Sequence, residues 1–232
     1  MEFIKAVGKS EIQDENIATS TIILGEPKVG KTTLATSASE DGLAILFNFE
    51  NRVRHIKESD TLKILPAKNK ICQLENIKNV TKFVRENPDH GIKYVIFDTV
   101  DSWFFNLQRE VFNVKSRTSI TFDERTNINL TINDCIDCFK NEFNINVIMN
   151  LHTKKDNETG KIGIGLDNDL KKIINKYADN VFYLEIGMNK KRVLYTGNHY
   201  LYQCGNSSEL GKPMPEQIEE PTWKKILELL KG

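Results

Sequence analysis

A glycine-rich segment near the N-terminus has the residue types and spacing of a phosphate-binding loop. Residues 25–33 read GEPKVGKTT and match the pattern G-x-x-x-x-G-K-[ST]. The segment follows the apolar run 21–24 and opens a helical pattern, so its backbone N–H groups can converge on a phosphate at a helix N-terminus. Lys31 would then reach the β- and γ-phosphates of ATP, and the Thr32 hydroxyl would bind Mg²⁺. The predicted phosphate-binding residues are Gly25, Glu26, Pro27, Lys28, Val29, Gly30, Lys31, Thr32 and Thr33.

A site for ATP and Mg²⁺ also needs a carboxylate at the end of a neighbouring strand. Asp98 directly follows the apolar run 94–97 and is our candidate metal ligand beside Thr32. A turn or a helix cap is the alternative role for Asp98. Thr99 either supports a metal-bound water or caps the helix that follows.

Two carboxylates compete for the role of the base that orients water for hydrolysis. Glu50 closes the second apolar run, 43–47, and the carboxyl edge of a parallel sheet faces the ligand. Asp101 lies at the start of a predicted helix, where capping is the simpler role. We therefore predict Glu50 as the base.

His152 follows another apolar run, 147–149, and is expected at the same sheet edge. A polar group there can sense the γ-phosphate and transmit its loss to the next loop, although a single histidine is also a common structural residue. The predicted catalytic set is Glu50, Lys31 and His152.

Composition limits the kind of protein that carries these residues. The 232 residues include 32 basic and 32 acidic side chains, so the chain is not broadly basic and any contact with nucleic-acid phosphates must be local. The four cysteines include a single C-x-x-C, at 135–138, with no second pair, and suit a reducing compartment. We expect no secretory signal, because residues 1–16 contain no apolar stretch of the kind that a signal peptide needs, and no membrane span, because no apolar run approaches 18 residues.

Apolar runs alternate with helical periodicity, which predicts an α/β fold with a mostly parallel sheet and helices on both faces. After a helix at 170–177, two runs around a Gly-Met-Asn turn predict a C-terminal antiparallel extension, and a last helix begins near Pro221. We expect an N-terminal segment, 1–18, and one domain, 19–232. Phe3 to Ala6 in that segment suggests a contact between subunits of an oligomer.

The order of the phosphate loop, Glu50, the strand-Asp-Thr of VIFDT and the strand-then-His of VIMNLHTKK resembles the RecA-like branch of P-loop ATPases. With the terminal Pro-Thr-Trp at 221–223, the chain is most similar to the phage single-strand-annealing proteins of the Sak-four group. The resemblance implies a RecA-like P-loop NTPase core, slow DNA-modulated ATP hydrolysis with Glu50 as base, single-stranded DNA binding, and annealing in phage recombination. It also implies a homo-oligomer, ring or filament, that works beside a single-strand-binding protein in the cytoplasm of a bacterial host. The group often has Asp where this chain has Asn48, which puts the rate of hydrolysis in question.

RecA-like cores hold DNA on two loops, which would be 115–127 and 154–169 here. The candidate DNA contacts are Lys154, Lys155, Lys161, Lys115 and Arg117. A solvated loop is the alternative for 154–169, which also carries four acidic residues. Lys191 and Arg192 lie at a hairpin turn and are candidates for a finger that acts in trans on a neighbour's ATP.

The sequence leaves two other functions open. A P-loop nucleotide or small-molecule kinase normally has an arginine-rich lid, and residues 154–169 contain no arginine. An assembly module that uses ATP only to set its oligomeric state would not need Glu50.

Overall fold

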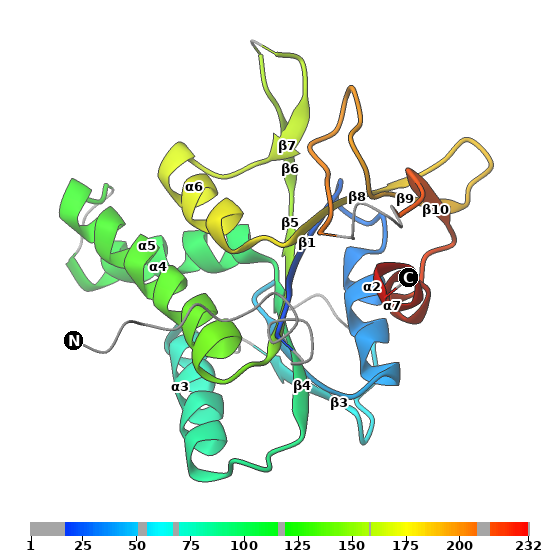
Figure 1. Ribbon diagram of the computed structural model, residues 1–232. Helices are drawn as coiled ribbons and strands as arrows, with labels where there is room; N and C mark the ends of the chain where they lie inside the picture. The colour runs from blue at the N-terminus through cyan, green and yellow to red at the C-terminus, as the bar shows by residue number, and fades with distance from the viewer. Residues whose placement is uncertain are drawn as a thin grey trace, which may run out of the picture.

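The computed structural model describes residues 17–50, 55–66, 70–115, 119–157, 159–207 and 214–231. An eight-stranded sheet in the order β10-β9-β8-β1-β5-β4-β2-β3 runs through the centre of the molecule (Figure 1). Its strands are β1 (Ser20–Leu24), β2 (Leu43–Asn48), β3 (Leu62–Pro66), β4 (Ile92–Asp98), β5 (Asn146–Leu151), β8 (Asn180–Ile186), β9 (Arg192–Tyr195) and β10 (Gln217–Glu219).

Six neighbouring strands of this sheet are parallel, as the alternation of strands and helices predicts: β8, β1, β5, β4, β2 and β3. Their central residues are buried on both faces, which is why they read as continuous apolar runs and not as alternating ones. The carboxyl ends of β1, β2, β4 and β5 therefore meet at one edge of the sheet.

Helices cover both faces of the sheet, as predicted (Figure 1). One face packs against α3 (Lys70–Glu86), α4 (Val100–Lys115), α5 (Phe122–Asp137) and α6 (Asn168–Tyr177). The other packs against α2 (Lys31–Thr36), the short helix η1 (Ser37–Glu40) and α7 (Trp223–Lys231). Trp103 of α4 stacks on Phe49 and Phe97 with ring centroids 5.1 and 5.2 Å apart, which fixes the start of α4 against the ends of β2 and β4.

The predicted antiparallel extension is confirmed: β9 pairs antiparallel with β8, and β10 with β9. Our interpretation of 154–169 as a loop was wrong. Strands β6 (Thr153–Lys155) and β7 (Ile162–Ile164) form a two-stranded antiparallel hairpin that leaves the main sheet directly after β5. A π-helical turn, η2 (Cys138–Glu142), continues α5.

Most of the predicted N-terminal segment, including Phe3 to Ala6, lies outside the described residues, so the expected oligomer contact stays a prediction. Within the described part of the chain, no helix has the length and apolar character needed to cross a membrane.

Candidate functional site

The phosphate loop connects β1 to α2, and its lysine is held inside the loop. The Lys31 side chain is buried, and its Nζ donates hydrogen bonds of 2.7 Å to the Gly25 carbonyl and 3.0 Å to the Glu26 carbonyl. Burial lowers the pKa of Lys31, while the negative charges of nearby carboxylates, Asp101 first among them, oppose that shift. The ammonium group is thus held by loop carbonyls, and a bound phosphate would add a further negative charge close to it.

Positions 25 and 30 of the motif both require glycine, Gly25 because of a close neighbour and Gly30 because of its backbone conformation. A Cβ on Gly25 would lie 2.4 Å from the backbone carbonyl oxygen of Leu184 in β8. Gly30 is the N-cap of α2 in a left-handed conformation, with φ of 100°. The backbone can therefore form the phosphate cradle that the sequence pattern predicts.

The predicted metal ligands come together at the end of β4. Thr32 Oγ1 donates a 2.8 Å hydrogen bond to Asp98 Oδ2, and Asn150 Nδ2 of β5 donates one of the same length to Asp98 Oδ1. Burial raises the pKa of Asp98, and the two hydrogen bonds oppose that shift. Asn150 Oδ1 is itself buried without a hydrogen-bond partner.

These oxygen donors suit Mg²⁺, which binds hydroxyl and carboxylate oxygens and keeps several waters. Thr32 and Asp98 would hold the ion, and the free Oδ1 of Asn150 fits a metal-bound water. Bound Mg²⁺ would neutralise charge on the triphosphate. Asn150 was missed in the sequence because a polar residue inside an apolar run gives no signal of its own.

Glu50 lies two residues beyond β2 and is fixed by hydroxyl groups at the start of α4. The hydroxyl oxygens of Thr99 and Ser102 lie 3.1 and 3.2 Å from Glu50 Oε1. Thr99 Oγ1 also accepts a hydrogen bond of 3.4 Å from the Ser102 N–H, so Thr99 caps α4 as one of its two predicted roles. The Glu50 carboxylate is thereby held at the sheet edge that carries the phosphate loop.

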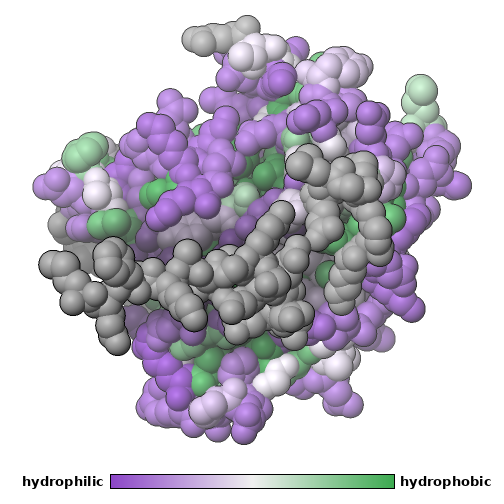
Figure 2. Space-filling view, in the orientation of Figure 1, coloured by the Kyte–Doolittle hydropathy of each residue, from purple (hydrophilic) through white to green (hydrophobic). Residues whose placement is uncertain are grey.

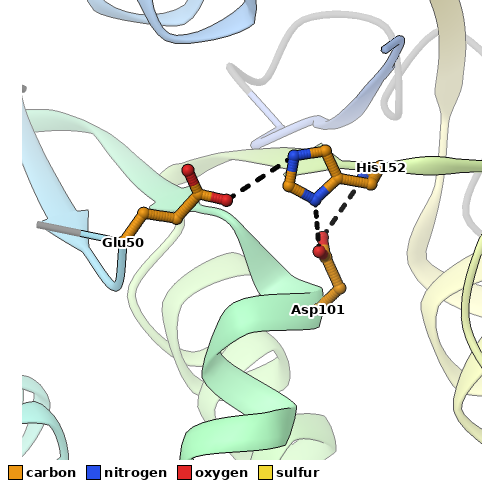
Figure 3. A group of neighbouring side chains, drawn as sticks. All are labelled: Glu50, Asp101 and His152. Atoms are coloured by element: carbon orange, nitrogen blue, oxygen red, sulfur yellow. Dashed lines mark hydrogen bonds and ion pairs between the residues drawn. The ribbon is translucent and has the colours of Figure 1, made fainter. Parts of the chain in front are cut away.

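His152 lies between Glu50 and Asp101 (Figure 3). Its Nδ1 is hydrogen-bonded to Asp101 Oδ2, its backbone N–H donates 3.2 Å to Asp101 Oδ1, and its Nε2 lies 3.5 Å from Glu50 Oε1. Asp101 is expected from the sequence to cap the helix; in the structure its carboxylate oxygens are hydrogen-bonded to the side chain and the backbone N–H of His152. The three side chains offer ligand atoms within 4.8 Å of one another, although their separation in the sequence shows no metal-ligand pattern.

The Asp101–His152 pair has opposed pKa shifts. The hydrogen bond to Asp101 raises the pKa of His152 above its ordinary value of 6.5, against the effect of burial. Burial alone would raise the pKa of Asp101, but its bonds to His152 outweigh burial and lower that pKa. The pair therefore stabilises the charged form of the His152 imidazole beside the Glu50 carboxylate.

A cavity of about 390 Å³ opens beside these three residues. Pro27 of the phosphate loop and Arg109 of α4 also line it. The cavity gives water access to Glu50, and Arg109 adds a positive charge that no motif in the sequence indicated.

The remaining predicted residues lie away from Glu50, Asp101 and His152, or outside the described residues. Lys154, Lys155 and Lys161 are exposed on or beside the β6–β7 hairpin. Lys191 forms an ion pair with Glu219 at 3.5 Å, and Arg192 lies against Gly30 of the phosphate loop in the same chain. Arg117 and the side chain of Lys115 lie outside the described residues.

A parallel sheet with a phosphate loop after its first strand, a buried Asp98 beside Thr32 and a glutamate at the same edge defines a P-loop nucleotide-binding domain. The sequence matches the family described as AAA domain (AAA_24) over residues 18–208. The chain belongs to this family. A search of curated proteins found no match to this sequence. The family implies that the domain binds ATP with Mg²⁺ and hydrolyses it.

Proposed function

We propose that this protein is an ATPase that binds single-stranded DNA on the β6–β7 hairpin and, as a homo-oligomer, promotes strand annealing in phage recombination. The observation that carries the proposal is the continuity between the nucleotide site and the hairpin. His152 lies in the site, and Lys154 and Lys155 follow at once on β6. Between them, Thr153 Oγ1 donates a 2.9 Å hydrogen bond to the Glu26 carboxylate of the phosphate loop. A rearrangement of the loop on nucleotide binding would therefore act directly on the hairpin.

The hairpin presents a local basic surface on a neutral chain. Lys154, Lys155 and Lys161 line a cavity of about 730 Å³, together with Lys171 of α6 and one acidic residue, Asp156. The acidic Asp167 in the same segment is engaged elsewhere: its carboxylate accepts a hydrogen bond from the Leu170 N–H and lies 3.7 Å from Arg125. Figure 2 shows that the upper part of this face is mainly hydrophilic. Such a surface suits a phosphate backbone.

A stack of aromatic rings, here called the column, lies beside the lysines of the β6–β7 hairpin. Tyr202 stacks on Tyr183 with centroids 3.7 Å apart, His199 on Tyr202 at 4.6 Å, and Tyr200 lies 4.6 Å from His199. Tyr200 ends the column and is 77% exposed. Unpaired bases can extend such a stack, whereas bases inside a duplex cannot, which favours single-stranded DNA as the partner.

The experiment is a titration of fluorescent oligo-dT with the protein at several salt concentrations, with ATP and Mg²⁺ present. Each phosphate that the protein neutralises contributes about −0.7 to the log–log slope. Replacing Lys154, Lys155 and Lys161 by Ala should weaken binding and flatten the slope by about two units. A matched triple variant at Lys78, Lys82 and Lys224, far from the hairpin, should leave the slope unchanged.

Annealing of complementary oligonucleotides and the mass of the complex test the remaining parts. Annealing that depends on the three hairpin lysines, by particles heavier than a monomer, would support the full proposal. A wild-type protein that binds no oligo-dT at low salt would refute the DNA role. Phosphorylation of a nucleoside monophosphate in the absence of DNA would instead assign the protein to the kinases.

A further inference from the structure

The β8–β9 hairpin lies against both ends of the phosphate loop. At one end the Leu184 carbonyl approaches Gly25. At the other, the Arg192 side chain lies over Gly30, so closely that a Cβ there would be 2.8 Å from Arg192 Nε and 3.0 Å from its Cζ. The guanidinium group therefore occupies the space beside the N-cap of α2.

The fold fixes this position from two sides. In a strand, residues two apart point to the same face, so Arg192 shares its face with Leu194. Leu194 packs in the same buried cluster as Leu34 of α2, which directs Arg192 toward the start of that helix. The backbone of Arg192 is also paired in both directions with Glu220: its N–H donates 2.8 Å to Glu220 Oε1, and its carbonyl accepts 2.8 Å from the Glu220 N–H.

The charge of Arg192 lacks an ion-pair partner in the described parts of the chain. The neighbouring Lys191, by contrast, is paired with Glu219. A half-buried guanidinium without a carboxylate, at a helix N-terminus built to receive phosphate, is arranged to contact an anion.

We propose that Arg192 binds a phosphate of the nucleotide held by its own chain, in cis. The proposal replaces the expectation that Arg192 reaches into a neighbouring subunit, and it rests on nucleotide binding at the phosphate loop. Since Gly30 adjoins the part of the loop that holds the α- and β-phosphates, the contact is made to ADP as well as to ATP.

The first experiment measures the affinity for Mg·ADP and Mg·ATP by calorimetry. Arg192→Ala should weaken both by about 10- to 100-fold, the effect of losing a charged hydrogen bond. Lys190→Ala, which removes an exposed charge from the same hairpin turn, should change neither by more than about twofold. If Arg192→Ala does not fold, Arg192→Gln keeps most of the side-chain stem and serves in its place. Unchanged affinity, or tighter binding because the arginine had obstructed the loop, would overturn the proposal.

The second experiment separates action in cis from action in trans by mixing two variants that each bind ATP weakly, at an ATP concentration below the dissociation constant of either. Lys31→Ala has a damaged loop and an intact Arg192, whereas Arg192→Ala has the reverse. If Arg192 acts in cis, the mixture hydrolyses ATP no faster than the sum of its parts. Recovery of hydrolysis in the mixture would show that Arg192 serves a neighbour and would refute the proposal.

Failure of this inference is distinguishable from failure of the proposed function. If the wild-type protein binds no nucleotide, both the proposed function and the inference about Arg192 are wrong. If nucleotide binding depends on Lys31 but not on Arg192, only the inference about Arg192 is wrong.

Discussion

Replacing Glu50 by Gln should separate nucleotide binding from hydrolysis. The glutamine keeps the shape of the side chain and a carbonyl oxygen that can face the Thr99 and Ser102 hydroxyls, which lie 3.1 and 3.2 Å from Oε1. It loses the negative charge that draws a proton from water. A positioned base contributes about 10²- to 10⁴-fold to a rate, so turnover should fall by that factor, equivalent to about 3–5 kcal/mol of activation free energy.

Asp101→Asn is the matched comparison, because both Asp101 oxygens are bonded to His152 and neither is free to act as a base. This variant weakens a charged hydrogen bond worth about 1.5–3 kcal/mol, so an indirect effect on turnover of at most about 10- to 100-fold is expected. A larger loss of turnover in Glu50→Gln than in Asp101→Asn would identify Glu50 as the base and Asp101 as a residue that positions His152.

The assay is phosphate release at saturating Mg·ATP, with nucleotide affinity from calorimetry and folding from thermal melts. Both variants should bind ATP within about threefold of the wild-type affinity, since neither removes a group of the phosphate loop. Turnover of Glu50→Gln close to that of the wild type, or a larger loss in Asp101→Asn, would refute the assignment of Glu50.

Three further predictions test other parts of the site. Lys31→Ala should weaken ATP binding by about 1–3 kcal/mol in a calorimetric titration, and affinity within twofold of wild type would contradict its phosphate contact. Gly25→Ala should destabilise the fold by about 1–3 kcal/mol in denaturant unfolding, whereas Gly197→Ala, whose Cβ would meet no atom closer than 3.8 Å, should stay within about 0.5 kcal/mol. The raised pKa of His152 contributes stability below pH 6.5 that is lost as pH rises through the folded-state value, and the lowered pKa of Asp101 contributes stability above pH 3.8 that is lost on acidification. The stability difference between wild type and Asp101→Asn should therefore be largest between about pH 4 and 6.5, and a pH-independent difference would count against the pair.

The parallel sheet could be predicted because its signals are local. Each buried strand is an apolar run, and the phosphate loop has a fixed spacing between a strand and a helix. The ends of β2, β4 and β5 follow from the same runs, which is why Glu50, Asp98 and His152 were placed correctly at one edge.

What could not be predicted depends on contacts between distant segments. Asp101 looks like a capping residue because it enters a helix, and only the fold brings it to His152, 51 positions away. The β6–β7 hairpin has strands of three residues, too short for a period of two to stand out from a polar, glycine-containing loop. Arg192 reaches Gly30 only because β9 lies beside β8 and β8 beside β1.

The place of β5 in the sheet explains how one strand can connect the nucleotide site to the β6–β7 hairpin. Between β1 and β4, it lies next to the strand that carries the phosphate loop and to the strand that ends in Asp98. Asn150 therefore contacts Asp98, and His152 reaches Glu50. Because the chain then leaves the sheet as β6, the hairpin cannot move without moving Thr153, whose hydroxyl bonds to the phosphate loop at Glu26. Any ligand held by the hairpin lysines is thus connected to the nucleotide site through three consecutive residues, 152–154, and not through a long path across the core.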